Sequence, residues 1–190
     1  NDYWAEPTVD NFPMLYADKP FNYSFYRQLD GTVRNLIKNI DYTKYEEGIY
    51  VGYRYFNTFN KKAIAYPFGY GLSYTDFKFD DMTIEETEGG WKVSVLVTNT
   101  GKVAGKDVVQ LYVKAPGKEL DKPERELKGF AKTPVLNPGE SYNAEIFVSK
   151  ESLASFDEAA DSWKLEKGTY TFIAAKHSLD NSLKAKIAIK

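Results

Sequence analysis

The feature that most constrains this chain is a repeated alternation of apolar and polar residues that begins at Phe77 and continues to the last residues. Side chains with a period of two belong to a strand with one buried face. In the run from Trp91 to Thr98, for example, every second residue is a large apolar one. Seven short runs of this kind occupy residues 77–85, 91–98, 109–113, 127–131, 142–148, 168–174 and 183–189.

Turn-forming residues separate these runs. Asn99-Thr100-Gly101, Pro116-Gly117 and the stretch from Asn137 to Glu140 supply the positive φ and fixed φ that turns require. One helical turn is expected near residues 149–156, with Ser149 as its N-cap. The spacing predicts an all-β fold, a seven-strand antiparallel sandwich of the immunoglobulin or fibronectin III kind. The alternation places these side chains inside it: Val93, Val95, Val109, Leu111, Ile146, Phe172 and Ile187.

Composition excludes several classes of function. The formal net charge of −2 provides no basic field, so we expect no nucleic-acid partner. Cysteine is absent and histidine occurs once, which leaves no thiolate or histidine cage, and we expect neither a metal nor a cofactor. No apolar run approaches the roughly 20 residues of a membrane span, so no membrane partner is expected. Localisation stays open between a cytoplasmic and a secreted soluble protein.

The first 74 residues are built differently. They hold 19 aromatic side chains, namely 12 Tyr, six Phe and Trp4. Aliphatic residues are too few for an independent core. A short helix is expected at residues 32–40 and a strand at 49–59, and residues 1–30 show no clean period. We interpret residues 1–74 as a mostly irregular, aromatic-rich arm, and residues 75–190 as the sandwich domain.

Two long motifs within this sequence resemble a known family. Residues 47–56 read EGIYVGYRYF, and residues 66–77 read YPFGYGLSYTDF. In this order they resemble the end of the α/β sandwich domain of family 3 glycoside hydrolases, where the second motif leads directly into a fibronectin III-like domain. Three later stretches resemble the last third of that domain: 153–157, Trp163 and 168–170.

The resemblance implies the carboxy-terminal part of a β-glucosidase-type enzyme that removes β-linked sugars with retention. In that family an Asp on a barrel domain is the nucleophile, and a Glu, usually on the α/β domain, is the acid/base. The family's sequence motif around the nucleophile matches no position here, and neither does its motif around the acid/base. We therefore expect no catalytic residue in this chain. Some members place the barrel after the fibronectin III-like domain, and the piece is therefore either terminal or internal. Its partners would be the catalytic domains of the parent enzyme and, through them, a β-linked oligosaccharide.

The candidate binding residues are Tyr53, Arg54 and Tyr55, because an Arg between aromatic rings can contact a sugar or a carboxylate. A structural role, in which Arg54 ties the arm to the sandwich, is favoured over binding. The adjacent acids Glu46 and Glu47 would face opposite sides of a strand and do not form a catalytic pair.

Other motif-like features have plainer explanations. The stretch from Gly71 to Thr75 lacks the last glycine of a nucleophile elbow. The glycines Gly69 and Gly71 are expected to shape a turn and to permit a close backbone approach. His177 is expected in a hairpin loop.

Three functions remain in competition. The first is a non-catalytic structural portion that braces the catalytic domains. The second is a carbohydrate-binding module acting through surface aromatics, and the third is a plain fibronectin-type spacer, which the aromatic arm disfavours. An arm of exposed aromatics would also make the isolated chain prone to self-association.

Overall fold

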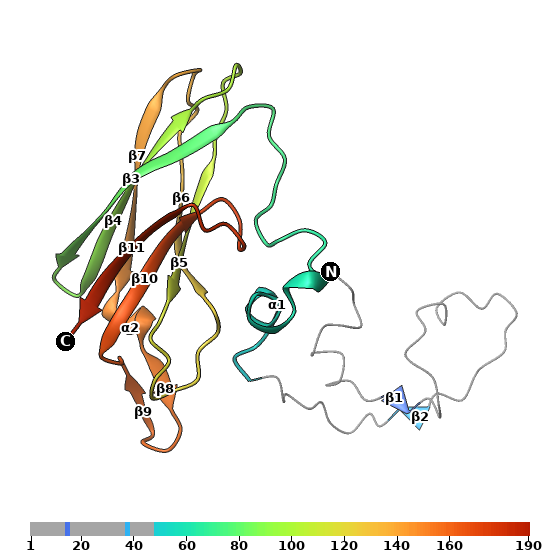
Figure 1. Cartoon of the computed structure of the whole chain (residues 1–190), viewed down its shortest axis with the longest axis vertical. Helices are drawn as coiled ribbons and strands as arrows, with labels where there is room; N and C mark the ends of the chain where they lie inside the picture. Colours follow the sequence, from blue (N-terminus) through green and yellow to red (C-terminus); the bar gives the residue numbers. More distant parts are fainter. Residues whose placement is uncertain (1–13, 16–36, 39–47) are drawn as a thin grey trace, which may run out of the picture.

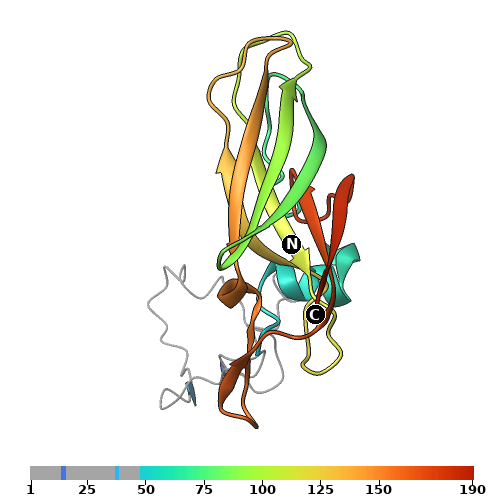
Figure 2. The ribbon, with the colours of Figure 1, turned by 90° about the vertical axis from the view of Figure 1, so that its left-hand side faces the viewer.

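The computed structural model describes residues 14–15, 37–38 and 48–190. Within residues 77–189, two antiparallel sheets form the predicted β-sandwich (Figures 1 and 2). One sheet has the order β3-β4-β7, with bounds Phe77–Thr87, Gly90–Asn99 and Ser141–Ser149. The other has the order β11-β10-β5-β6, with bounds Leu183–Ile189, Gly168–Ala175, Val108–Lys114 and Glu126–Lys132. All seven predicted strands are confirmed.

Short elements complete the described part. Two helices are present, α1 at Tyr53–Phe59 and α2 at Lys150–Leu153, with one 3-10 turn at Lys61–Ala63. Strands β8 (Ser155–Asp157) and β9 (Ser162–Lys164) pair with each other as a separate hairpin that the alternation did not predict. Strands β1 (Met14–Leu15) and β2 (Ile37–Lys38) form another two-stranded pair.

The core lies between the two sheets, as the period of two requires. Six of the seven side chains expected inside are buried: Val93, Val95, Val109, Leu111, Ile146 and Phe172. Ile187 is only half-buried and packs against the edge of this core. Its strand, β11, is at the end of its sheet and pairs on one side only, with β10. A side chain on such an edge strand keeps part of its surface in solvent.

The predicted turn at residues 137–140 and the predicted helix cap are present. Gly139 has a φ of 81°, and Glu140 donates its backbone N–H to the carbonyl of Asn137 over 2.9 Å. At the start of α2 the hydroxyl of Ser149 accepts the backbone N–H of Ser152 over 3.1 Å, which is the N-cap expected from the sequence.

The prediction of a strand at residues 49–59 is wrong, because the chain forms α1 there. Gly52, with a φ of 57°, reverses the chain just before the helix, a conformation that favours glycine. The helix lies against the outer face of the β5–β6 sheet (Figure 1). On that face Tyr112 and Ile173 are buried, and Tyr53 packs against them. Burial of this apolar face overrides the strand preference of the aromatic residues.

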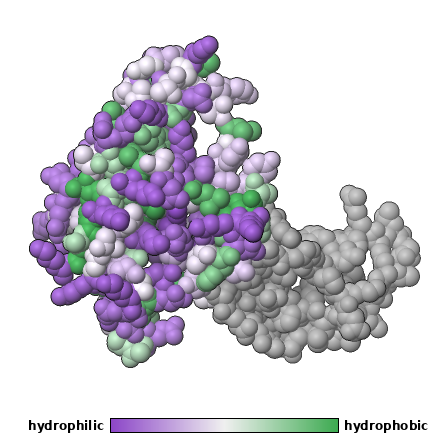
Figure 3. All heavy atoms as spheres, viewed as in Figure 1, coloured by the Kyte–Doolittle hydropathy of each residue, from purple (hydrophilic) through white to green (hydrophobic). Residues whose placement is uncertain are grey.

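Several expectations fall outside the described residues, including those for Glu46 and Glu47 and for residues 1–30 apart from Met14 and Leu15. Of the helix expected at 32–40, only Ile37 and Lys38 are described, and they belong to β2. In the part of the chain that the structure describes, no helix is both long and apolar enough to cross a membrane. Figure 3 shows the viewed face of the sandwich as mostly hydrophilic, with separate apolar patches.

Candidate functional site

Most of the second motif lies in a strap, residues 64–76, that connects the end of the helical segment to β3 (Figure 1). It is tied to the sandwich at both ends. The carbonyl of Phe68 accepts the backbone N–H of Ser178 over 2.8 Å. The hydroxyl of Thr75 donates to the side-chain oxygen of the fully buried Asn99, also over 2.8 Å. The strap therefore has a fixed course across the sandwich.

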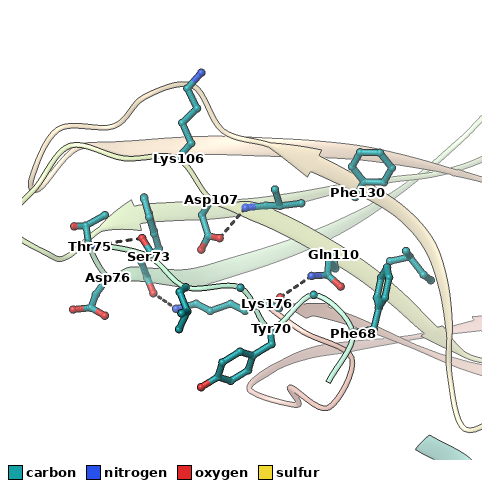
Figure 4. Close-up of a pocket in the computed structure, with 16 residues that line it drawn as sticks. Phe68, Tyr70, Ser73, Thr75, Asp76, Lys106, Asp107, Gln110, Phe130 and Lys176 are labelled. Atoms are coloured by element: carbon teal, nitrogen blue, oxygen red, sulfur yellow. Dashed lines mark hydrogen bonds between the residues drawn. The ribbon is translucent and has the colours of Figure 1, made fainter. Parts of the chain in front are cut away.

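A groove of about 660 Å³ opens between the strap and the strands beneath it (Figure 4). We call it the strap groove. Three of its aromatic rings are largely exposed, namely Phe68, Tyr70 and Phe130. Its polar lining includes Asp76, Asp107, Gln110 and Lys176. Exposed rings beside polar groups are a common composition for a small-molecule site. Whether the groove can bind a ligand therefore depends on which of its polar groups are free of hydrogen bonds within the protein.

Most of these polar groups are engaged within the protein. The amide of Gln110 donates to the carbonyl of Lys176 over 2.6 Å and accepts the hydroxyl of Tyr112 over 2.7 Å. The ammonium of Lys176 donates to the carbonyl of Phe77 and lies 5.5 Å from the ring centre of Phe79. These contacts join β10, β5 and β3, and they make the groove floor a structural junction.

A retaining pair needs two carboxyl groups about 5 Å apart across the scissile bond, and the strap groove is lined by the carboxylates of Asp76 and Asp107, which lie in different environments. Burial raises the pKa of Asp107, while the N–H of Val108 and the nearby Lys176 act in the opposite direction. Asp76 is exposed, and its hydrogen bonds use the backbone carbonyl, which accepts the N–H groups of Thr100 and Gly101.

The glycines of the strap have the expected structural role. Gly69 has a φ of 82°, and a Cβ atom there would lie 2.0 Å from Nε2 of Gln110. The hydroxyl of Ser73 accepts the backbone N–H of Thr75 over 3.2 Å. His177 lies in the β10–β11 loop as expected, where its Nδ1 accepts the N–H of Leu179 over 3.3 Å.

The three predicted binding residues diverge around α1. The hydroxyl of Tyr53 accepts the backbone N–H of Leu127, and its ring stacks on Phe68 with 5.6 Å between centres. Arg54 places Nε 3.5 Å from Oε1 of Glu126. Tyr55 packs its ring against Phe56 and Phe59.

Consecutive helical residues project about 100° apart, so these three side chains do not share one face. The contact between Arg54 and Glu126 ties α1 to β6, which is the structural role that the sequence favoured. A direct role of the three residues in substrate binding stays a prediction.

Sequence reasoning missed Glu166, which is almost completely buried just before β10. Its carboxylate accepts three successive backbone N–H groups, from Lys118 at 2.9 Å, Glu119 at 3.1 Å and Leu120 at 3.2 Å. The ammonium of Lys122 lies 3.5 Å away. Burial by itself raises the pKa of Glu166, but the three N–H groups and Lys122 outweigh it and lower the pKa below its usual value.

No sequence signal marks Glu166, since its N–H partners lie more than 40 residues away. Its carboxylate holds the loop between β5 and β6 in place. Glu166 is buried, and its carboxylate is bonded to three backbone N–H groups of this loop and lies beside Lys122. We therefore interpret it as a structural residue and not as a candidate acid/base.

The fold and its sequence define the class of protein. Residues 107–178 match the fibronectin type III-like domain family. Together with the two-sheet sandwich, this makes the domain a fibronectin type III-like one.

The comparisons with longer proteins go further. The chain is 43% identical over 164 residues to β-glucosidase A of Butyrivibrio fibrisolvens, and 45% identical over 141 residues to a β-glucosidase of Ruminococcus albus. These alignments cover 75% and 72% of the chain, but only 20% and 15% of the relatives. The structure of β-glucosidase 3B from Thermotoga neapolitana with α-D-glucose matches 77% of the chain at a TM-score of 0.72 and 43% identity.

The chain thus corresponds to the part of family 3 glycoside hydrolases of the β-glucosidase type that includes their fibronectin type III-like domain. The resemblance predicted from the two motifs is confirmed. The chain spans about a fifth of the length of the Butyrivibrio and Thermotoga proteins.

Proposed function

We propose that this chain is a non-catalytic structural portion of a retaining β-glycosidase of the β-glucosidase type. In this proposal residues 1–74 are the end of an α/β sandwich domain and its lead-in arm, and residues 75–190 are the fibronectin type III-like domain. The similarity to much longer β-glucosidases supports a role as part of a larger glycosidase. Gln110 and Lys176 of the strap groove use their side chains for hydrogen bonds within the protein, which supports a structural role over a catalytic one.

The observation that carries the proposal is the two-sided character of the strap. Its inner side is bonded to the sandwich through Phe68 and Thr75. Its other side leaves Leu72 95% exposed and Tyr74 fully exposed, with Tyr66 at 71%. Large apolar side chains gathered on one exposed segment mark a surface for a partner. The partner that fits is the remainder of the parent enzyme, which in the relatives is several times longer than this chain.

A chimeric enzyme tests the proposal. The corresponding fifth of the Butyrivibrio fibrisolvens β-glucosidase A is replaced by this chain, and hydrolysis of an aryl β-glucoside is measured. An active chimera is expected, since the brace would restore the domain contacts. The double change Leu72→Ser with Tyr74→Ser should then lower its activity and melting temperature together. The matched double change Tyr142→Ser with Phe147→Ser, at exposed aromatic residues of β7 that do not line the strap groove, should leave both unchanged.

An inactive but folded chimera would contradict the structural role. So would a chimera whose activity is insensitive to the two strap substitutions.

We also propose that the isolated chain self-associates through its amino-terminal arm, because apolar side chains that the parent enzyme would cover are then left in solvent. Light scattering over a range of concentrations tests this. A chain that stays monomeric at high concentration would contradict it. The alternative function, saccharide binding through surface aromatics, is favoured by one observation at a different place on the domain, the aromatic hairpin described next.

A further inference from the structure

The β8–β9 hairpin presents two large aromatic rings to solvent. Phe156 and Trp163 are directly opposite each other in its register, with ring centres 5.7 Å apart and planes inclined by 72°. Phe156 is 45% exposed and Trp163 is 71% exposed. The hairpin projects from one end of the sandwich (Figure 2). These rings contribute little to the core, so their exposure calls for another role.

Side-chain contacts order the turn of the hairpin and connect it to the loop between β5 and β6. The ammonium of Lys164 pairs with the carboxylate of Glu119, and the carboxylate of Asp157 accepts the backbone N–H groups of Ala159 and Ala160 at 3.1 and 3.2 Å. A two-stranded hairpin alone is marginally stable, and these contacts add modestly to its stability. They favour the observed pairing of the two rings, and a pairing that exists before binding lowers the entropic cost of binding a ligand.

A groove of about 840 Å³ runs beside the pair, and we call it the hairpin groove. This volume is in the range of roughly 300 to 1,000 Å³ typical of small-ligand sites. Its lining includes Tyr50, Asp121, Lys128 and Glu158 together with the two rings. An apolar platform thus adjoins hydrogen-bonding groups, as a ligand with one apolar face and many hydroxyls would require.

The charge of the hairpin groove narrows the ligand class. Its lining contains one ammonium, that of Lys128, and five carboxylates: Asp121, Glu126, Glu151, Asp157 and Glu158. This excess of negative charge disfavours nucleic acids and sulfated or uronic-acid polymers. Carboxylates accept hydrogen bonds from hydroxyl groups and make them shorter and stronger than neutral acceptors do. A neutral polyol fits the groove best.

We propose that the hairpin groove binds a neutral oligosaccharide, with one pyranose ring stacked on Trp163 and its hydroxyls donating to Asp121 and Glu158. The indole offers a flat apolar surface to the apolar face of the ring. This site shares no residue with the strap groove, whereas two residues of its lining, Tyr50 and Glu126, also contact α1. It does not depend on whether the chain braces a catalytic domain.

The test uses the full 190-residue chain and four probes: cellopentaose, laminaripentaose, maltopentaose and heparin. Titrations are followed by calorimetry and by the indole N–H resonances in nitrogen-15 NMR spectra. The Trp163 resonance, assigned through Trp163→Phe, is expected to shift with at least one neutral pentaose at a dissociation constant on the order of 1 mM. Heparin should cause no shift.

Variants locate the site. Trp163→Ala should weaken binding by about tenfold or more, equivalent to ~1.4 kcal/mol, whereas Trp163→Phe should keep part of the affinity. Glu158→Gln, an exposed change that leaves the rings intact, should weaken binding by a smaller factor. Phe147→Ala is the matched control, since Phe147 is an exposed ring on β7, outside the hairpin groove.

Three results would overturn the proposal. The first is an unmoved Trp163 resonance at high pentaose concentration, and the second is an equal loss of binding in Phe147→Ala. The third is a Trp163→Ala variant that alters only the oligomeric state, which would make the hairpin a protein-docking surface. A failed titration leaves the outcome of the chimera experiment unaffected, so the two proposals fail separately.

Discussion

The hydroxyl of Tyr53 in α1 accepts the backbone N–H of Leu127 in β6 over 2.8 Å, across 74 positions of sequence. The same ring packs edge-on against Tyr112, whose side chain is fully buried. Burial raises the pKa of the Tyr112 hydroxyl, and the nearby Tyr53 adds to that effect. Helix α1 is therefore a cover for the outer face of the second sheet.

Substitution of Tyr53 should separate its hydrogen bond from its packing. We expect Tyr53→Phe to lower the free energy of unfolding by about 1 kcal/mol, because the Leu127 N–H loses its acceptor. Tyr53→Ala should cost about 2 to 3 kcal/mol, since a half-buried ring is removed as well. Urea denaturation measures both, with the exposed Tyr66→Phe as a control near zero. Equal effects of the two Tyr53 substitutions would contradict this division.

The buried Glu166 should make the domain sensitive to acid. Its pKa is lowered in the folded protein, so the ionised carboxylate stabilises the fold at pH values above the unfolded-state pKa of roughly 4.3. That stabilisation is lost as the pH falls through the lower, folded-state value. Glu166→Gln should cost about 2 kcal/mol at neutral pH and flatten the acid limb of the stability profile.

Chemical denaturation of the wild type and Glu166→Gln between neutral and acidic pH checks this prediction. Glu88→Gln, at an exposed carboxylate in the β3–β4 turn, is the matched control and should follow the wild type at every pH. If Glu166→Gln retained the wild-type acid dependence, another group would be responsible for it.

A charge in the core should unfold the sandwich. Val95 in the centre of β4 is fully buried, and Val95→Asp would bury an unpaired carboxylate at a cost of several kcal/mol. Circular dichroism should show loss of the cooperative transition. Lys102→Asp, at an exposed position just beyond β4, should melt as the wild type does. A folded Val95→Asp domain would mean that its core tolerates water.

The isolated chain should not hydrolyse aryl β-glucosides. Neither family motif for the nucleophile or the acid/base is found in its sequence. Release of nitrophenol from an aryl β-glucoside is the assay. Turnover by the purified chain that disappears on substitution of one of its carboxylates would show that the chain carries catalytic machinery.

The sandwich could be predicted because its strands have one solvent-exposed face and one buried face. The alternation around Val93 and Val95 and the turn at Gly139 encode strand, face and boundary locally. Ile187 shows the limit of this reasoning. Alternation predicts which face of a strand a residue is on, but it does not predict that β11 lies at the edge of its sheet, where Ile187 is only half-buried.

Helix α1 and Glu166 could not be predicted in this way because their determinants are distant in sequence. The aromatic residues of α1 favour a strand by local preference, and only the apolar face around Tyr112 makes a helix the better cover. Glu166 depends on N–H groups in a loop that precedes it by more than 40 residues. The groove beside Phe156 and Trp163 likewise needs residues from four separate segments.

The last prediction concerns where the folding unit begins. A chain that starts at Phe77 keeps every strand of the sandwich but loses α1 and the strap. It thereby uncovers Tyr112, Ile173 and Ala175 on the outer face of the second sheet. It also removes the hydroxyl of Thr75 from the buried Asn99.

Exposure of that face should lower the free energy of unfolding by about 3 kcal/mol or more and should promote binding of an apolar dye. A chain that starts at Gly48 keeps these contacts and serves as the matched control, with the stability of the described domain retained. Denaturation curves and dye fluorescence of the two truncations decide the matter. If both were equally stable, α1 and the strap would be dispensable to the sandwich, and their contacts with it would serve only to orient the exposed residues Leu72 and Tyr74.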